Sequence, residues 1–526
     1  MRTYFFVFAG LCGVLAVVLA LVAPAGLWAY LVLGPLLLVG FRDALQRRHA
    51  VLRNFPILGH GRYLLELIRP EINQYFIESD TDGRPFGRDQ RSLVYQRAKR
   101  QLATLPFGTQ KDVYAVGHEW ISHSLAARHL PEEEPRVLIG EGTCSQPYSA
   151  SLLNISAMSF GSLSGRAVEA LNRGAREGSF AHNTGEGGIS AYHRAGGGDL
   201  IWQIGTGYFG CRAPDGSFDP GLFAEKAADP QVKMIEVKLS QGAKPGHGGI
   251  LPAEKLTPEI AEIRHVPLGE DVLSPPAHSA FSTPVELLGF LTELRRLSGG
   301  KPVGIKLCVG SRSEFLGICK AMVETGRHPD FIAVDGAEGG TGAAPLEFSD
   351  SIGMPLVEGL VFVHNALTGF RVRDRVKLVA AGKIITGFHI AKALALGADL
   401  CYSARGMMLS IGCIQARRCN ANDCPVGVAT QRPDLVIGLD VEDKAPRAAR
   451  FHSETLRSFL EILGAAGLDH PSELEPRHLM RRVEAHDVRS FEELFEFVEP
   501  GALLHDPVPE SFEQAWHASR SDAFVG

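Results

Sequence analysis

The chain has 526 residues, of which 45% are apolar and 21% are charged, and its net charge is -6. This length allows one domain of roughly 250 to 300 residues with appendages, or two to three average domains, and the slightly acidic balance argues against a nucleic-acid partner. The nine cysteines are odd in number and mostly lie in apolar stretches, unlike the disulfide framework of a secreted protein. The composition therefore predicts a globular protein of a reducing compartment.

Two apolar runs open the chain, over residues 4–23 and 26–41. The first reaches the ~20 residues that cross a bilayer, and the second is slightly short. A basic cluster follows the second run directly, formed by Arg42, Arg47 and Arg48. The alternative is a signal peptide cleaved near residues 27–29, but the second run and the basic flank favour retention. The positive-inside rule then predicts a two-helix anchor over residues 1–48 in the cytoplasmic membrane, with the rest of the chain in the cytoplasm.

The segments on either side of the central region lack catalytic motifs. Residues 49–135 have mixed composition and predict a helical cap or linker, with a helix over 61–68. Residues 437–526 are polar and predict a helical segment that packs against the central domain, with helices over 445–463 and 490–497.

Between residues 136 and 436, short apolar strands alternate with glycine-rich turns and helices about eight times. This order predicts an α/β fold, a (β/α)8 barrel of the TIM type, in which catalytic groups gather where the parallel strands end. The predicted strands cover residues 152–158, 179–183, 200–204, 234–238, 303–307, 331–335, 376–380 and 400–404.

Three cysteines fall within twelve residues just after the last predicted strand: Cys413, Cys419 and Cys424. Three thiolates so close together are typical of an iron-sulfur cluster, whereas a zinc site requires a fourth ligand. The nearest histidines, His389 and His452, are distant in sequence, so a 3Fe-4S cluster is favoured. A fourth ligand from elsewhere, such as Cys401, would still allow zinc, and three merely buried thiols are the remaining alternative.

Glycine-rich segments follow each of the last three predicted strands. They contain Gly339, Gly340 and Thr341, then Gly382, then Arg405 and Gly406. Backbone N–H groups in such loops bind phosphate at this end of a barrel. Any one loop is weak evidence because turns use glycine anyway, but three in succession predict a phosphate-bearing cofactor.

Two lysines, Lys238 and Lys306, end apolar strands, where a buried ammonium group is costly without an anion. Reduced flavin supplies such an anion near its N1 atom, although each lysine taken alone is better explained by reaching to the rim of the barrel. Lys244 lies on a rigid turn suited to a substrate carboxylate. Glu186 is a candidate for proton transfer or amine binding, although a lone loop glutamate is usually just solvated.

Taken together, five segments resemble the FMN-binding synthase domain of glutamate synthase. These segments begin at Met158 (MSFGSLS), Asn183 (NTGEGG), Lys238 (KLSQGAKPG), Gly339 (GGTGA) and Gly412 (GCI), the last ending in CPVGVATQ. They occur in the family's order over about residues 150–432. The resemblance implies FMN above the strand ends, a 3Fe-4S cluster on the three cysteines, and formation of glutamate from 2-oxoglutarate and ammonia.

The same resemblance implies roles for individual residues. Those expected at the flavin and substrate site are Glu186, Lys238, Gln241, Lys244 and Arg264. Those expected to bind the cofactor are Met158, Ser159, Gln203, Lys238, Lys306, Asp335, Gly339, Gly340, Thr341, Gly382, Arg405 and Gly406.

The sequence also departs from the family. It has neither the N-terminal cysteine glutaminase domain nor the C-terminal β-helix of the full enzyme, so ammonia or another amine is the expected nitrogen source. Ile250 stands where the family has glutamine, and His278-Ser279-Ala280 stands where it has His-His-Asp. No dinucleotide-binding fingerprint occurs, so electrons must come from a donor that the sequence does not identify.

The leading hypothesis is therefore reductive amination of a 2-oxo acid by a membrane-anchored flavoprotein. Two alternatives remain. The same cofactors would act on an N-substituted or other amino acid, or the barrel would be a non-catalytic electron-transfer subunit at the membrane.

Overall fold

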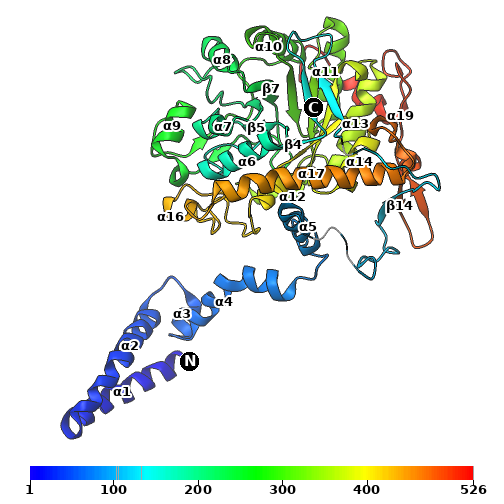
Figure 1. The fold of residues 1–526 in the computed structure, drawn as a ribbon. Coiled ribbons are helices and arrows are strands. Elements are labelled where there is room, and N and C mark those ends of the chain that lie inside the picture. The colour runs from blue at the N-terminus through cyan, green and yellow to red at the C-terminus, as the bar shows by residue number, and fades with distance from the viewer. Residues whose placement is uncertain (102–103, 105, 132, 525–526) are drawn as a thin grey trace. The chain divides into compact units, whose positions relative to one another are not determined.

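The computed structural model describes residues 1–101, 104, 106–131 and 133–524. The chain forms two compact units, Met1–Asp89 and Gln90–Gly526. Figure 1 shows the elements of each. The barrel and everything predicted to carry chemistry lie in the second unit.

The first unit is helical. It consists of α1 (Arg2–Val22), the 3-10 helix η1 (Pro24–Ala29), α2 (Tyr30–Leu45), α3 (Ala50–Asn54), α4 (Gly59–Ile72) and the π-helical turn η2 (Asn73–Ile77). Two stretches, Arg2–Val22 and Pro24–Leu45, are long and apolar enough to cross a membrane, a test that a signal sequence also passes. The buried Asp43 carboxylate accepts hydrogen bonds from the Ile57 amide (3.0 Å) and the His60 ring (2.9 Å), which joins the end of α2 to the start of α4.

The second unit is built around a closed parallel barrel with the strand order β10-β11-β12-β13-β4-β5-β6-β7. The strands are β4 (Leu153–Ile155), β5 (His182–Asn183), β6 (Leu200–Ile204), β7 (Val232–Lys238), β10 (Val303–Leu307), β11 (Phe331–Asp335), β12 (Lys377–Ala381) and β13 (Leu400–Ser403). The predicted barrel is confirmed, and all eight strands match predicted ones. The first two are shorter than expected, so Met158 lies in the loop after β4 rather than within it.

Helices on the outside of the barrel bury one apolar face each. They include α6 (Gly165–Glu177), α7 (Ala191–Gly196), α8 (Pro220–Ala227), α9 (Pro258–Arg264), α10 (Pro284–Leu297), α11 (Arg312–Thr325), α13 (Leu356–Gly369), α14 (Gly387–Ala395) and α15 (Arg405–Ser410). In α10 the Thr283 hydroxyl caps the first turn, Pro284 occupies the first helical position, and Leu287, Leu291 and Leu294 are buried. Such spacing places apolar side chains on one side of a helix.

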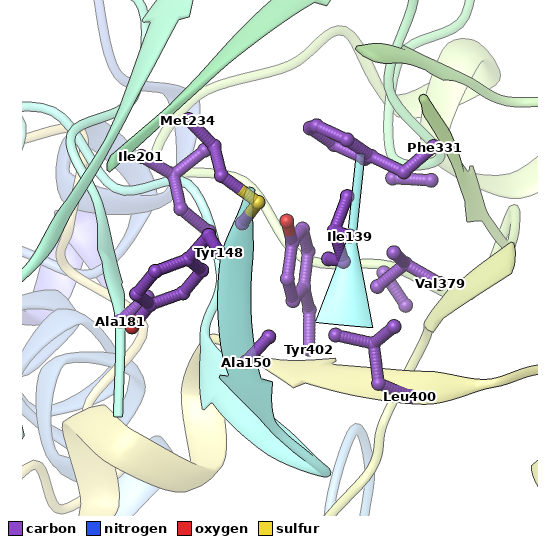
Figure 2. Packing of buried hydrophobic residues seen from close by; sticks show 12 residues of the cluster. Ile139, Tyr148, Ala150, Ala181, Ile201, Met234, Phe331, Val379, Leu400 and Tyr402 are labelled. Atoms are coloured by element: carbon purple, nitrogen blue, oxygen red, sulfur yellow. The ribbon is translucent and has the colours of Figure 1, made fainter. Parts of the chain in front are cut away.

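A hydrophobic core cluster lies among the barrel strands and a hairpin that packs against them (Figure 2). A hairpin formed by β2 (Arg136–Ile139) and β3 (Tyr148–Ser151) contributes Ile139, Tyr148 and Ala150. These pack against Ala181, Ile201, Met234, Phe331, Ala333, Val379, Ala381, Leu400 and Tyr402 from the barrel. Phe331 and Leu400 are the first residues of β11 and β13, so apolar side chains fill the amino-terminal part of the barrel.

The C-terminal segment contains the predicted long helix, α17 (Val441–Ala465), which the Asp440 side chain caps and which packs on α6 and α14. The helix predicted over 490–497 is shorter: α18 covers Phe491–Leu494, and Phe495 is already extended. A three-stranded antiparallel sheet was not predicted. It joins β1 (Glu119–Ile121), β14 (Leu479–Arg482) and β15 (Val488–Ser490), and its strands are too short for a periodic signal.

Candidate active site at the carboxyl ends of the strands

A polar layer lies inside the barrel beyond the hydrophobic core. Side chains alternate along a strand, so Met234, Glu236 and Lys238 of β7 share one face. Met234 belongs to the core. Glu236 Oε1 accepts hydrogen bonds from Asn183 Nδ2 (2.8 Å) on β5 and Gln203 Nε2 (2.6 Å) on β6. Burial raises the pKa of Glu236, against the lowering effects of Lys306 and these two amides.

A buried ion pair lies on the neighbouring strands β10 and β11. Lys306 Nζ is 3.3 Å from Asp335 Oδ2, which also accepts a hydrogen bond from the Gly242 amide (3.0 Å). Burial by itself would lower the pKa of Lys306, but the Asp335 and Glu236 carboxylates outweigh it and raise that pKa. Lys306 is therefore a fixed cation beside the middle of the barrel.

Glu186 and Lys238 form a second ion pair at the carboxyl end of the barrel. Lys238 Nζ is 3.1 Å from Glu186 Oε2 and donates a 2.6 Å hydrogen bond to Gln241 Oε1. Burial would raise the pKa of Glu186, but Lys238, Lys244 and Arg264 outweigh it and hold the pKa below its usual value. Glu186 is thus a carboxylate held among three cations.

Two glycines make room for the Glu186 side chain. A Cβ at Gly205, just after β6, would lie 2.6 Å from Glu186 Oε2 and 2.8 Å from its Cβ. A Cβ at Gly249 would lie 2.3 Å from Glu186 Oε1. Gly249 precedes Ile250, the first residue of β8 (Ile250–Leu251), which pairs with β9 (Val272–Leu273). The segment that departs from the family pattern therefore borders the Glu186 carboxylate.

Lys244 and Arg264 lie near Glu186 without a carboxylate ion pair of their own among the described residues. Lys244 Nζ donates to the Ala343 carbonyl (3.0 Å), and Arg264 Nη2 donates to the Phe160 carbonyl (3.1 Å). The Arg264 guanidinium also lies 5.1 Å from the centre of the Phe209 ring. Burial lowers the pKa of Lys244 to about 8 and that of Arg264 to about 10. Two buried cations with spare donors suit an anionic ligand.

The predicted glycine loops come together beyond β11, β12 and β13. Arg405 Nη2 donates to the Glu338 carbonyl (2.7 Å), and a Cβ at Gly340 would lie 2.5 Å from Arg405 Nε. Gly382 has φ +158° and lies against Leu356 and Glu338. The structure therefore brings together five of the predicted phosphate-binding residues: Gly339, Gly340 and Gly382 lie in loops, and Arg405 and Gly406 begin α15. Thr341 follows Gly340 in the same loop, where its hydroxyl donates to the Ala343 carbonyl (3.2 Å).

The loops after β4 and β5 pack on each other. A Cβ at Gly185 would lie 2.6 Å from the Ser159 amide nitrogen, and Ser159 Oγ is 3.0 Å from Ser162 Oγ. Met158 is buried in the same loop. Met158 and Ser159 therefore lie beside the loop that carries Glu186.

The three clustered cysteines lie in a loop that follows α15. All nine cysteines of the chain are free. Burial raises the pKa of Cys413 to about 12 with Cys419 and Cys424 adding to the rise, so the three thiols are near enough to interact. Among the residues that the structure describes, no three His, Cys, Asp or Glu side chains gather closely enough for a single metal ion. Cys401 lies within β13 and is buried there.

Further contacts join the cysteine loop to the rest of the second unit. The Tyr95 hydroxyl of α5 (Arg88–Lys99) donates to the Cys413 carbonyl (2.7 Å). Gln431 Nε2 donates to the Gly161 and Leu163 carbonyls (3.0 and 2.8 Å), in the loop after β4. The cysteine loop is therefore bonded to the same loop that carries Met158 and Ser159.

Two residues of the site, Glu236 and Lys255, were not singled out from the sequence, and Asn183 and His278 were noted only as parts of family segments. The alternation of β7 places Glu236 on the face of Lys238, a signal that was available. His278 Nε2 lies 2.9 Å from the Lys238 carbonyl, and burial lowers the His278 pKa to about 4, so the neutral ring donates its Nε2 proton there. No sequence signal identifies the partners of His278 or Lys255, because those partners are distant in the chain.

Comparison with known proteins identifies the family. The model of a conserved region in glutamate synthase matches residues 121–469. The chain is 38% identical over 483 residues to the glutamate synthase large subunit-like protein YerD of Bacillus subtilis, covering 84% of this chain and 92% of that protein. It is 36% identical over 335 residues to the archaeal-type glutamate synthase (NADPH) of Thermotoga maritima, covering 63% of this chain but only 62% of that protein.

Solved structures of mandelate oxidase are similar at a much lower level, with 14% identity and a TM-score of 0.42 over 82% of this chain and 96% of that one. The barrel architecture rests on the strand order given above and not on this similarity. From the family model and the Bacillus relative, the chain belongs to the glutamate synthase family and is an oxidoreductase that acts on amino-acid donors.

Proposed function

We propose that the protein is an FMN- and 3Fe-4S-dependent oxidoreductase that reductively aminates a 2-oxo acid, with 2-oxoglutarate as the first candidate. One oxo acid, one ammonium ion, two electrons and two protons give glutamate and water. The observation that carries the proposal is the Glu186–Lys238 pair (3.1 Å) with two further buried cations beside it at the carboxyl end of the barrel. Active sites of such barrels lie at this end.

The residues present fit FMN. The loops with Gly339, Gly340 and Gly382 and the start of α15 at Arg405 supply backbone amides and a guanidinium for a phosphate. Lys306 and Lys238 supply cations on the strands that a flavin ring would cover. Bound FMN supplies hydride transfer to the substrate.

The cysteine loop fits a cluster better than a single metal ion. Thiolates around one tetrahedral ion at 2.3 Å stand about 3.8 Å apart, and the described thiols are not gathered in this way. A cluster binds each cysteine through a different iron atom and so accepts a wider spacing. The buried ammonium of Lys255 adds support, because the neighbouring Cys419 and Cys424 would compensate its charge as cluster-bound thiolates.

The residues proposed to act on the substrate have different roles, according to their charge. Lys244 and Arg264 would bind carboxylate groups, since neither forms an ion pair with a carboxylate of the described chain and the single Glu186 carboxylate is already paired with Lys238. Glu186 would accept or deliver protons at the amine nitrogen, and Gln241 would keep Lys238 in place through the 2.6 Å hydrogen bond. His278 would hold Lys238 in position by donating a hydrogen bond to the Lys238 backbone carbonyl.

A second candidate substrate is an N-substituted or other amino acid acted on with the same cofactors. Ile250 favours it, because this apolar residue follows Gly249 at the Glu186 carboxylate where a polar side chain is expected. Membership of an enzyme family speaks against the third hypothesis, an electron-transfer subunit without catalysis.

We further propose that α1 and α2 anchor the protein in the cytoplasmic membrane, with the barrel in the cytoplasm. The two stretches have mean hydropathies of 2.9 and 1.7, and side chains such as Leu21 and Val22 are about four-fifths exposed in the described chain. The Arg42, Arg47 and Arg48 cluster supports the orientation.

The test is anaerobic turnover of purified full-length protein with a chemical reductant, ammonium and a panel of 2-oxo acids. Glutamate formed from 2-oxoglutarate supports the leading proposal. Product from another oxo acid only, or flavin reduction by an N-substituted amino acid, supports the second candidate. Failure of every oxo acid to reoxidise the reduced flavin overturns reductive amination.

A further inference from the structure

Lys255 is a fully buried lysine with an unusual set of partners. It ends the short helix η3 (Ala253–Lys255) and is 2% exposed. Its ammonium group donates hydrogen bonds to three backbone carbonyls, those of Ser162 (2.8 Å), Cys419 (3.2 Å) and Ala429 (3.3 Å). It makes no ion pair with any carboxylate that the structure describes. A buried charge without a counter-charge is strongly destabilising.

The ionisable groups near the Lys255 ammonium are the Cys419 and Cys424 thiols, with the Arg264 guanidinium as a neighbour of like charge. As neutral thiols, the two cysteines leave the ammonium uncompensated. Cysteine thiolates that hold a cluster carry net negative charge and would compensate it.

The three carbonyls come from both sides of the redox site. Ser162 belongs to the loop after β4, which also carries Met158 and Ser159. Cys419 and Ala429 belong to the cysteine loop and its continuation. The Lys255 ammonium therefore bonds the predicted flavin loop and the predicted cluster loop at a single point.

We propose that Lys255 is the counter-ion of the iron-sulfur cluster and that its positive charge raises the reduction potential of the cluster, favouring electron acceptance ahead of the flavin. This inference rests on the proposed function. The added electron makes the cluster more negative, so a fixed cation beside it stabilises the reduced form more than the oxidised form. Lys255 is a positioning residue that acts through the cluster and does not touch the substrate.

The experiment compares full-length wild-type protein with Lys255→Met, Lys255→Arg and a matched control, Lys301→Met. Lys301 is also buried, and its ammonium also donates to backbone carbonyls, those of Ala227 (2.5 Å) and Asp229 (2.9 Å), but it has no thiol among its electrostatic partners. Methionine keeps the unbranched shape of lysine and removes the charge. The readouts are iron and flavin content and a redox titration followed by electron paramagnetic resonance.

We expect Lys255→Met to shift the one-electron reduction equilibrium of the cluster at least tenfold toward the oxidised form, which is about 59 mV. Lys301→Met should leave this reduction equilibrium unchanged. Lys255→Arg should keep it close to that of the wild-type protein, because arginine retains the positive charge. Loss of iron from Lys255→Met alone, with flavin retained, is the stronger form of the same result. An unchanged cluster potential in Lys255→Met, or equal loss of iron from Lys301→Met, overturns the inference.

Failure of the proposed function gives a different result. If wild-type protein carries no cluster, the cofactor proposal itself is wrong. If wild-type protein carries a cluster whose potential is insensitive to Lys255, only the role of Lys255 is wrong.

Discussion

The Glu186 carboxylate and the Lys238 ammonium lie 3.1 Å apart at the carboxyl end of the barrel, although Glu186 lies in the loop after β5 and Lys238 ends β7. Glu186 is 17% exposed and Lys238 is 9% exposed, so the pair is largely removed from water. In this setting a change in either charge affects the other strongly. The pair is therefore the most direct target for testing the site.

Replacing Glu186 by glutamine keeps the shape of the side chain and removes its charge. We expect turnover to fall by about 10²- to 10⁴-fold, the usual contribution of a general acid or base. The rate at which dithionite reduces the bound flavin should not change. Both rates are measured by stopped-flow absorbance, and a variant that keeps more than a tenth of wild-type turnover would show that Glu186 does not transfer protons.

The pH dependence of substrate binding should reflect the protonation state of Lys244. Its pKa is lowered to about 8, chiefly by burial, so the charged form that binds a carboxylate is lost as the pH rises through that value. KM for the oxo acid should therefore rise up to tenfold per pH unit above about pH 8. Arginine stays charged in this range, so KM of Lys244→Arg should change little above pH 8. An equal rise of KM in this variant would show that another group is responsible.

The free energy of unfolding should also depend on the protonation of Lys244, but this contribution should become more favourable as the pH rises. Because the folded-state pKa of Lys244 lies below its unfolded value, the unfolded chain binds the extra proton between about pH 8 and the ordinary lysine pKa of about 10.4. The Lys244 contribution to the free energy of unfolding should therefore increase with pH across that window. Urea titrations of wild-type protein and Lys244→Met at pH 7.5 and 9.5 measure it, and equal differences at the two pH values would contradict it.

Gly205 should be intolerant of a side chain because an added Cβ would overlap with the Glu186 side chain. A Cβ there would lie 2.8 Å from the Glu186 Cβ, so Gly205→Ala should displace the carboxylate and lower turnover by at least tenfold. Gly289→Ala is the control, since the only neighbour of a Cβ there is an Arg327 nitrogen at 3.7 Å. Equal activity of the two variants would mean that the position of Glu186 is not critical.

The cysteine loop should hold iron independently of the flavin. Cys419→Ala should lose cluster iron and the associated electron paramagnetic resonance signal while retaining FMN. Cys319→Ala should keep both, because Cys319 is buried in α11 with no thiol among its electrostatic partners. Full iron content in Cys419→Ala would remove that residue from the ligand set.

Removal of residues 1–48 should give a soluble protein that is still yellow-brown. The barrel and the cysteine loop belong to the unit Gln90–Gly526, so we expect the cofactor sites to form without α1 and α2. Full-length protein should pellet with membranes and resist extraction by salt. Truncated protein that still pellets, or that is colourless, would contradict the proposed division of the chain.

Much of the fold was predictable because it depends on neighbours in sequence. Short apolar runs followed by glycine-rich turns identified all eight barrel strands, and the helix predicted over 445–463 lies within α17. The sheet of β1, β14 and β15 was missed. Glu119 and Arg481 pair across it from opposite ends of the second unit, and its strands of three or four residues are too short to show a period.

The sequence alone determined which residue types are available at the site: the spacing of Cys413, Cys419 and Cys424, the lysines that end β7 and β10, and the glycine loops. Only the tertiary structure decided how they meet. It pairs Glu186 with Lys238, encloses Glu236 between two amides, and brings Lys255 to the Cys419 carbonyl 164 residues away. Charge and burial act through space, and closing the barrel sets those distances, so no local pattern contains them.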